Sequence, residues 1–248
     1  MASDRPQSDA LCRPLPEGGK ETWGGPAVHC EPQLRREICR VGRSLFERGY
    51  VHATAGNISV RLADGLGFLI TPTDACLGFI EPDTLAHVDA AGQPLGGARA
   101  SKTLALHRAI YAADAAAHCV IHTHSTHLVA LTLSGVWSAD DVLPPLTPYF
   151  VMKVGHVPFI PYRRPGDPAL ADDITLKIVA ARARGHVLHA VLHERLGPNV
   201  WHDCLGAAMA TLEELEETAK LWLMTQPRPA PLGADQINEL RSAFGASW

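Results

Sequence analysis

The chain has 248 residues, of which 46% are hydrophobic and 19% are charged, and its formal net charge is −4 at pH 7. This composition is typical of a globular protein that buries a sizeable core. A weak negative charge gives no general attraction to nucleic acid or to anionic membranes. No apolar run approaches the roughly 18 residues needed to cross a bilayer, and no secretory signal pattern follows the N-terminus. We therefore expect a cytoplasmic protein whose partners include neither nucleic acid nor membrane.

The two ends of the chain differ in composition from its centre. Residues 1–30 are rich in Pro, Gly, Ser and charge without apolar periodicity, which favours a flexible arm. We expect one folded domain over residues 31–226, followed by a C-terminal tail over residues 227–248 with a short helix at 234–244. Six scattered cysteines without CxxC spacing indicate neither a disulfide framework nor a cysteine zinc site.

The first half of the domain reads as a helix followed by a hairpin. Apolar residues recur at helical spacing over 32–48, and residues 54–62 and 67–71 alternate as two strands joined at Asp64-Gly65. A short strand follows at 85–89. Between these elements, the hydroxyl-rich loop Thr71-Pro72-Thr73-Asp74 offers side-chain and backbone donors that suit an anion, although Thr-Pro turns are common without such a role.

A helix is predicted from Ser101 to Ala113, with Ser101 as its N-cap. The N-terminus of a helix beside Lys102 is a natural seat for phosphate or carboxylate. For Lys102 taken alone, the alternative is an ordinary solvated surface lysine.

The apolar run at 119–122 ends in His122-Thr123-His124. Side chains alternate faces along a strand, so the two imidazoles are expected to point the same way, within reach of one divalent ion. Neutral imidazole binds zinc, manganese, iron or cobalt. The alternative is a chance pair, since the chain holds 13 histidines.

The second half continues the alternation of helices and strands. We expect helices at 126–133, 172–184 and 205–223, a buried strand at 190–192, and strands and loops rather than helix over 142–162. The acidic run at 213–217 is interpreted as a solvated helix face. This pattern indicates a single α/β domain.

Taken together, these segments resemble the class II aldolase/adducin family from about Gln33 to Met224. The resemblance is carried by Gly56-Asn57-Ile58-Ser59, Thr71-Pro72-Thr73, Ser101-Lys102 before a helix with His107, and His122-Thr123-His124-Ser125. Residues 147–155, 161–168 and 213–221 are most similar to the branch of 3-oxo-tetronate 4-phosphate decarboxylases. The fold implied is a three-layer αβα arrangement, in which helices flank a mixed, largely antiparallel sheet.

The resemblance also implies an activity. It is that of a metal-dependent lyase, a decarboxylase or retro-aldolase, acting on a small phosphorylated sugar acid or keto acid. The implied cofactor is a divalent metal, zinc first with manganese, iron or cobalt as alternatives, and the implied assembly is a homotetramer. Two alternatives stay open, namely a class II sugar-phosphate aldolase and a non-catalytic, adducin-like binding module.

Residue by residue, the resemblance makes His122 and His124 metal ligands. It also assigns a set of residues around the substrate phosphate or carboxylate, which are Gly56, Asn57, Thr73, Ser101 and Lys102.

Two positions depart from the family pattern. Thr103 stands where the family has an acid/base glutamate, and Leu196 stands where it has the third metal histidine. Either His193 as third ligand or Glu194 as ligand or catalytic carboxylate could replace what is missing. Glu194 lies an even number of residues before Leu196 and so faces the same side if the strand continues. The candidate catalytic residues are therefore Glu194 and Thr103, and a different layout that uses His127, His107 or a neighbouring subunit stays open.

Overall fold

The computed structural model describes residues 30–246 and 248, so the arm predicted for residues 1–30 lies almost entirely outside the described residues. Within that part, a single sheet of eight strands runs in the order β4-β3-β2-β1-β5-β8-β7-β6. All neighbours are antiparallel except β6 and β7. The strands are β1 (Asn57–Arg61), β2 (Phe68–Ile70), β3 (Ala86–Val88), β4 (Pro94–Gly96), β5 (Cys119–His122), β6 (Phe159–Ile160), β7 (Ala190–His193) and β8 (Gly197–His202).

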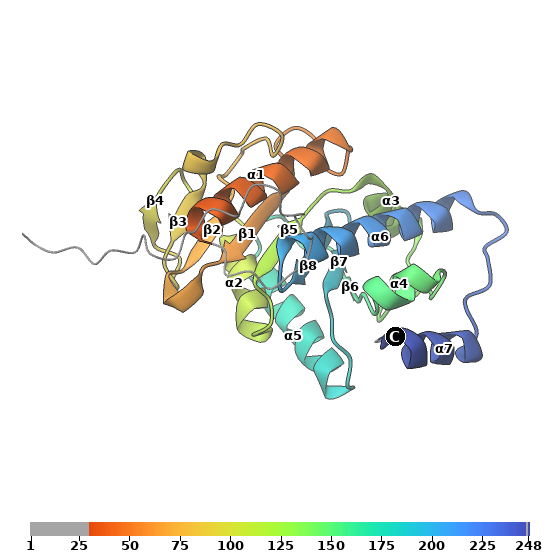
Figure 1. Ribbon diagram of the computed structural model, residues 1–248. Coiled ribbons are helices and arrows are strands. Elements are labelled where there is room, and N and C mark those ends of the chain that lie inside the picture. The colour runs from red at the N-terminus through yellow and green to blue at the C-terminus, as the bar shows by residue number, and fades with distance from the viewer. Residues whose placement is uncertain (1–29, 247) are drawn as a thin grey trace, which may run out of the picture.

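Helices cover both faces of this sheet (Figure 1). One apolar cluster joins the sheet to α1, α3, α4 and α6, and a second joins the opposite face to α2 and α5. The predicted three-layer α/β fold with a mixed, largely antiparallel sheet is therefore confirmed. The helices are α1 (Glu31–Glu47), α2 (Leu104–Ala113), α3 (Thr126–Ser134), α4 (Pro148–Lys153), α5 (Ala169–Ala183), α6 (Leu205–Met224) and α7 (Ala234–Phe244).

Local sequence patterns account for the elements that position the site. On α1, Ile38, Val41 and Leu45 recur at steps of three and four and are all buried. The predicted hairpin forms, with Ser59 opposite Ile70 and Arg61 opposite Phe68. Because β1 is antiparallel to β5, its first residue, Asn57, lies beside the last residue of β5, His122.

Several local predictions were wrong. The helix after Ser101 begins at Leu104 with Thr103 as its N-cap residue, so Ser101 is not the cap. Residues 148–153 form α4 because Pro148 occupies its first turn and the Thr147 hydroxyl accepts from Phe150 N. The acidic run on α6 is not wholly solvated, since Glu216 is only 6% exposed.

The C-terminal segment returns to the domain. The predicted terminal helix is α7, and Leu232 N donates to Pro145 O at 2.8 Å. The Trp248 ring lies 5.6 Å from the Phe150 ring of α4. The separation of a domain ending at residue 226 from a tail remains a prediction. No helix in the described ranges is long and apolar enough to span a membrane.

Candidate functional site

The segments that carry the sequence motifs meet at one edge of the sheet. Asn57 opens β1, and its register partner His122 closes β5. Asn199, near the start of β8, is the other register partner of His122. The three side chains therefore share one sheet face, the face that α2 and α5 cover.

Gly56 permits this close approach of β1 to β5. Its φ of +84° is a conformation that L side chains rarely adopt, and a Cβ there would lie 2.8 Å from His122 O. The glycine thus brings Asn57 beside His122, while Gly56 itself offers backbone rather than a side chain.

His122 is held in one tautomer. Its Nδ1 donates to Pro198 O at 2.8 Å, because a carbonyl oxygen only accepts. The neutral ring then carries its free lone pair on Nε2, the arrangement in which a second hydrogen bond orients a metal-binding imidazole. Burial, followed by the neighbouring His124 and His193, keeps the pKa of His122 well below its usual range.

His124 follows the strand and turns toward His122. The two ring centroids are 5.0 Å apart with the planes at 68°, and the His52 ring lies 6.5 Å from His124. Partial burial and then His52 lower the pKa of His124. Two neutral imidazoles that lie edge to face at this distance suit joint coordination of one cation.

The imidazole of His193 lies on the same sheet face as that of His122. His193 ends β7 with 2% of its surface exposed, and burial lowers its pKa to about 4. Within the described residues, neither of its ring nitrogens and neither polar atom of the Asn199 side chain has a hydrogen-bond partner. Asn199 still acts on His193, partly offsetting the effect of burial on the pKa, without reaching hydrogen-bond geometry. Buried polar atoms left unpaired are costly, so this pair is a feature that a bound group would explain.

Glu194 is engaged elsewhere. The strand ends at His193 and residues 194–196 form a turn, with Arg195 at a φ of +60°. The parity argument that aligned Glu194 with Leu196 therefore does not apply. The Glu194 carboxylate accepts from Tyr162 N at 2.9 Å, in the loop after β6, and within the described residues it joins the histidines in no group of three candidate metal ligands.

Three of the predicted anion-binding residues, Thr73, Ser101 and Lys102, come from two paired loops before α2. Thr73 N donates to Arg99 O, and Ser101 N donates to Thr71 O, so the two loops pair along their backbones. The Ser101 and Thr103 hydroxyl oxygens are 2.9 Å apart. This group presents hydroxyls where the resemblance predicts a carboxylate.

Lys102 extends into solvent at the same place. Its Nζ lies 3.8 Å from the Asp74 carboxylate, and both side chains are at least 67% exposed. Exposed pairs of this kind bind weakly, so the lysine can exchange partners for an anion in solution.

A complete metal-binding group is not assembled. In residues 30–246 and 248, no three side chains of His, Cys, Asp or Glu gather closely enough to hold one ion. The pair His122 and His124 fits the first two ligands of a divalent metal, because the Nε2 lone pair of His122 is free and the rings are adjacent. The orphaned ring of His193 has the right chemistry for a third.

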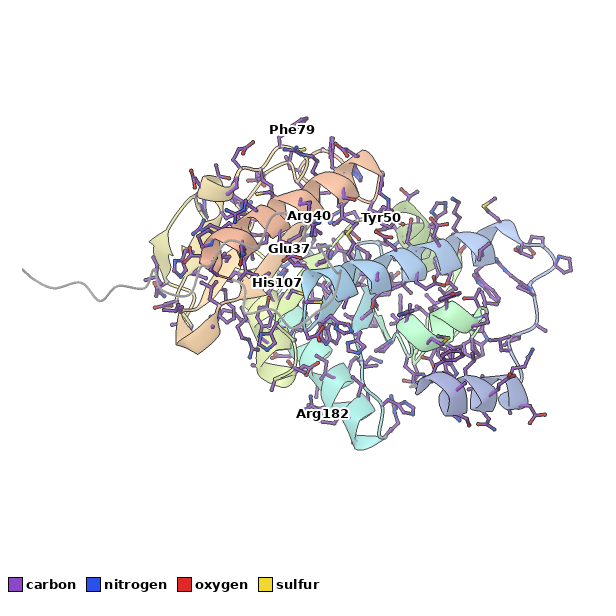
Figure 2. The ribbon with its side chains drawn as sticks, in the orientation of Figure 1. Glu37, Arg40, Tyr50, Phe79, His107 and Arg182 are labelled. Atoms are coloured by element: carbon purple, nitrogen blue, oxygen red, sulfur yellow. The ribbon has the colours of Figure 1, made fainter. Side chains whose placement is uncertain are left out.

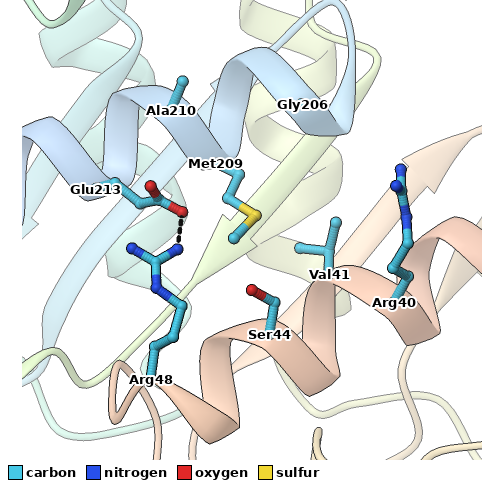
Figure 3. Close-up of a pocket in the computed structure, with 8 residues that line it drawn as sticks. All are labelled: Arg40, Val41, Ser44, Arg48, Gly206, Met209, Ala210 and Glu213. Atoms are coloured by element: carbon cyan, nitrogen blue, oxygen red, sulfur yellow. Dashed lines mark hydrogen bonds and ion pairs between the residues drawn. The ribbon is translucent and has the colours of Figure 1, made fainter. Parts of the chain in front are cut away.

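One cavity lies away from this edge (Figure 3). It measures about 410 Å³ and runs between α1 and α6, on the opposite face of the sheet. Arg48 pairs with Glu213 at one end, and Arg40 stands at the other. The cavity contains none of the predicted site residues and belongs to the packing of the two helices.

Sequence reasoning missed one residue of this site and gave another no definite role. Asn199 lies in β8, a strand that was not predicted, so the sheet face to which its side chain points could not be inferred. His107 contacts Asn57 directly, through Nε2 and Oδ1 at 2.6 Å. Its position on the buried side of the predicted helix was the available signal.

Comparison with known proteins identifies the family of the chain. The family model described as "Class II Aldolase and Adducin N-terminal domain" matches residues 36–223. The chain is 57% identical over 223 residues to the 3-oxo-tetronate 4-phosphate decarboxylase of Cupriavidus necator, covering 88% of this chain and 99% of that protein. It is 29% identical over 197 residues to the L-fuculose phosphate aldolase of Methanocaldococcus jannaschii, covering 77% and 96%.

A solved structure shows the same fold. YgbL from Escherichia coli superposes with a TM-score of 0.77 at 39% identity, over 85% of this chain and 99% of that one. The sequence match and the shared architecture lead to one conclusion, that the chain belongs to the class II aldolase and adducin family.

Proposed function

We propose that this chain is a carbon–carbon lyase that decarboxylates a small phosphorylated keto acid of the 3-oxo-tetronate 4-phosphate type. The observation that carries the proposal is 57% identity to a decarboxylase of that name over nearly the full length of both chains. The cluster of imidazoles, amides and hydroxyls at one sheet edge supports it, because such a substrate presents both anionic oxygens and a reacting carbonyl.

His122 and His124 would hold a divalent metal, with His193 as the candidate third donor. We propose zinc, with manganese, iron or cobalt as alternatives, since all accept neutral imidazole. When bound, such an ion supplies Lewis-acid stabilisation of negative charge. The chain's own contribution is to keep these rings neutral and to aim Nε2 of His122, through the hydrogen bond from Nδ1 to Pro198 O.

The polar residues near the histidines would bind the anionic ends of the substrate. The backbone next to Gly56, the amide of Asn57, and the hydroxyls of Thr73 and Ser101 offer hydrogen-bond donors, and Lys102 offers a positive charge. These donors are fixed by the fold before substrate arrives, which lowers the cost of ordering them.

Protons must be handled without the family carboxylate at the start of α2. Thr103 can orient a water or a substrate oxygen through its hydroxyl, which already contacts Ser101. Glu194 is tied to Tyr162 N, so we give it a structural role at the loop after β6 rather than a place in the reaction.

The test is a product assay on the purified protein with 3-oxo-tetronate 4-phosphate. Release of carbon dioxide that is lost in Asn57→Ala, with an unchanged fold, supports the proposal. The aldolase relative favours a second candidate, aldol cleavage, which would instead release an aldehyde from a sugar phosphate. Turnover of neither substrate would favour a non-catalytic binding module. A homotetrameric assembly, measurable by light scattering, and a cytoplasmic location, measurable by cell fractionation, remain predictions from the resemblance.

A further inference from the structure

Four side chains form a continuous hydrogen-bonded chain beneath the site. The Tyr111 hydroxyl lies 2.7 Å from Ser59 Oγ, and Ser59 Oγ lies 2.7 Å from His107 Nδ1. His107 Nε2 then lies 2.6 Å from Asn57 Oδ1. Two of these residues come from β1 and two from α2, so the chain joins the helix to the sheet (Figure 2 labels His107).

The chain is buried along its whole length. Ser59 and His107 are fully inaccessible, Tyr111 is 4% exposed, and Asn57 is 6% exposed. The far end is fixed by packing, because the Phe68 ring stacks on Tyr111 at 5.0 Å and 8°. Of the four side chains, it is Asn57 that lies at the end of its strand, beside His122.

The acceptor at Asn57 sets the direction of the chain. If Oδ1 faces His107, then Nε2 of His107 carries the ring proton and donates it, and Nδ1 accepts from the Ser59 hydroxyl. The Tyr111 hydroxyl can donate to Ser59 in turn. Burial lowers the pKa of His107 to about 3, so the ring stays neutral and keeps a single proton.

This direction leaves the Asn57 Nδ2 group for a ligand. No hydrogen bond from Nδ2 to any described residue is present, whereas Oδ1 is bonded to His107. The side chain shares its sheet face with His122, its register partner. An amide nitrogen in that place offers two N–H donors to an anionic oxygen.

We propose that Tyr111, Ser59 and His107 are positioning residues that orient the Asn57 amide so that its N–H groups donate to an anionic oxygen of the substrate. The inference rests on the proposed function, because it assumes that Asn57 binds substrate. Three polar side chains in an apolar layer are costly unless each is paired, and apolar residues of similar size would pack there more simply. Their joint action on Asn57 explains why they are present.

The matched test compares His107→Gln with His107→Asn. A glutamine amide reaches the position of Nε2 and can still donate to Asn57, whereas an asparagine amide reaches only the position of Nδ1 near Ser59. We expect His107→Asn to raise KM, and the Kd of inorganic phosphate, about tenfold with kcat within about threefold, and His107→Gln to restore most of the loss. His118→Asn, at an exposed histidine, is the control for the substitution itself.

Two outcomes would overturn the inference. One is equal KM and phosphate affinity in both His107 variants and the native protein, while Asn57→Ala alone loses binding. The other is a ¹⁵N spectrum in which the neutral His107 ring is protonated at Nδ1, since that reverses the chain. If Asn57→Ala itself leaves turnover and phosphate binding unchanged, the proposed role of Asn57 fails first. The ring tautomer is then the remaining, activity-independent readout.

Discussion

At the scale of single residues, His193 and Glu194 are neighbours with opposite surroundings. Sequence reasoning offered both as replacements for the missing third histidine. His193 is the last residue of β7 and shares the buried face of His122, with its ring nitrogens unpaired within the described ranges. Glu194 begins the turn and is bound to the backbone of Tyr162. The two residues differ because β7 ends between them, at a point that no sequence signal indicated.

This difference predicts opposite effects of adjacent substitutions. Glu194→Gln keeps an acceptor for Tyr162 N, so we expect divalent-metal affinity to stay within about twofold and the free energy of unfolding to fall by less than about 1 kcal/mol. His193→Asn should weaken metal affinity at least about tenfold. Titration of metal-free protein with zinc, together with urea denaturation, measures both. Metal affinity that falls with Glu194→Gln and survives His193→Asn would reverse the assignment.

At the scale of elements, the loop that carries His124 is fixed by α6. The Glu216 carboxylate accepts from His127 N at 2.9 Å, Leu128 N at 3.0 Å and His127 Nδ1 at 2.8 Å. A carboxylate there pairs the free N–H groups of the first turn of α3 and complements its dipole. The site loop is thus connected to a helix on the other face of the sheet.

We therefore expect Glu216→Ala to lower the free energy of unfolding by about 2–3 kcal/mol, because it leaves buried N–H donors unpaired. Glu217→Ala is the matched control from the same acidic run. Glu217 is 56% exposed and pairs only loosely with Lys220, so its loss should cost less than about 0.5 kcal/mol. Urea denaturation of both variants compares them directly. Equal losses in the two variants would show that the cap does not stabilise the loop.

The burial of Glu216 on α6 could not be predicted from the sequence. The acidic run holds four glutamates around Leu215, which faces the core, so helical spacing alone does not indicate that one of the glutamates is also buried. Glu216 is buried because the start of α3 lies opposite it, a contact 89 residues away in sequence. Strand β8 was likewise not predicted, because glycine and proline usually interrupt strands. Gly197 and Pro198 are accommodated here because the backbone of β8 passes close to Thr123. A Cβ on Gly197 would lie 2.2 Å from Thr123 O.

At the scale of the whole molecule, local periodicity indicated a single α/β domain, and the resemblance to the class II aldolase/adducin family implied its three layers. The apolar steps of α1 and the alternation of β1 and β2 depend on local spacing and form as expected, whereas the predicted His-x-His strand ends at His122, so that His124 lies in the loop after it. The order of the strands was beyond local patterns, because β5 joins β1 on one side and β8 on the other. That order brings Asn57, His122 and Asn199 into one row, and it explains why Asn199 could not be found from the sequence.

The central claim is that His122 and His124 jointly hold a divalent ion at this edge of the sheet. Elemental analysis of the purified native protein, of His122→Ala, of His124→Ala and of the exposed-histidine control His118→Ala tests it most directly. We expect about one divalent ion per chain in the native protein and in the control, and its loss in both site variants at unchanged fold. An ion that is retained in full by His122→Ala and His124→Ala would contradict it.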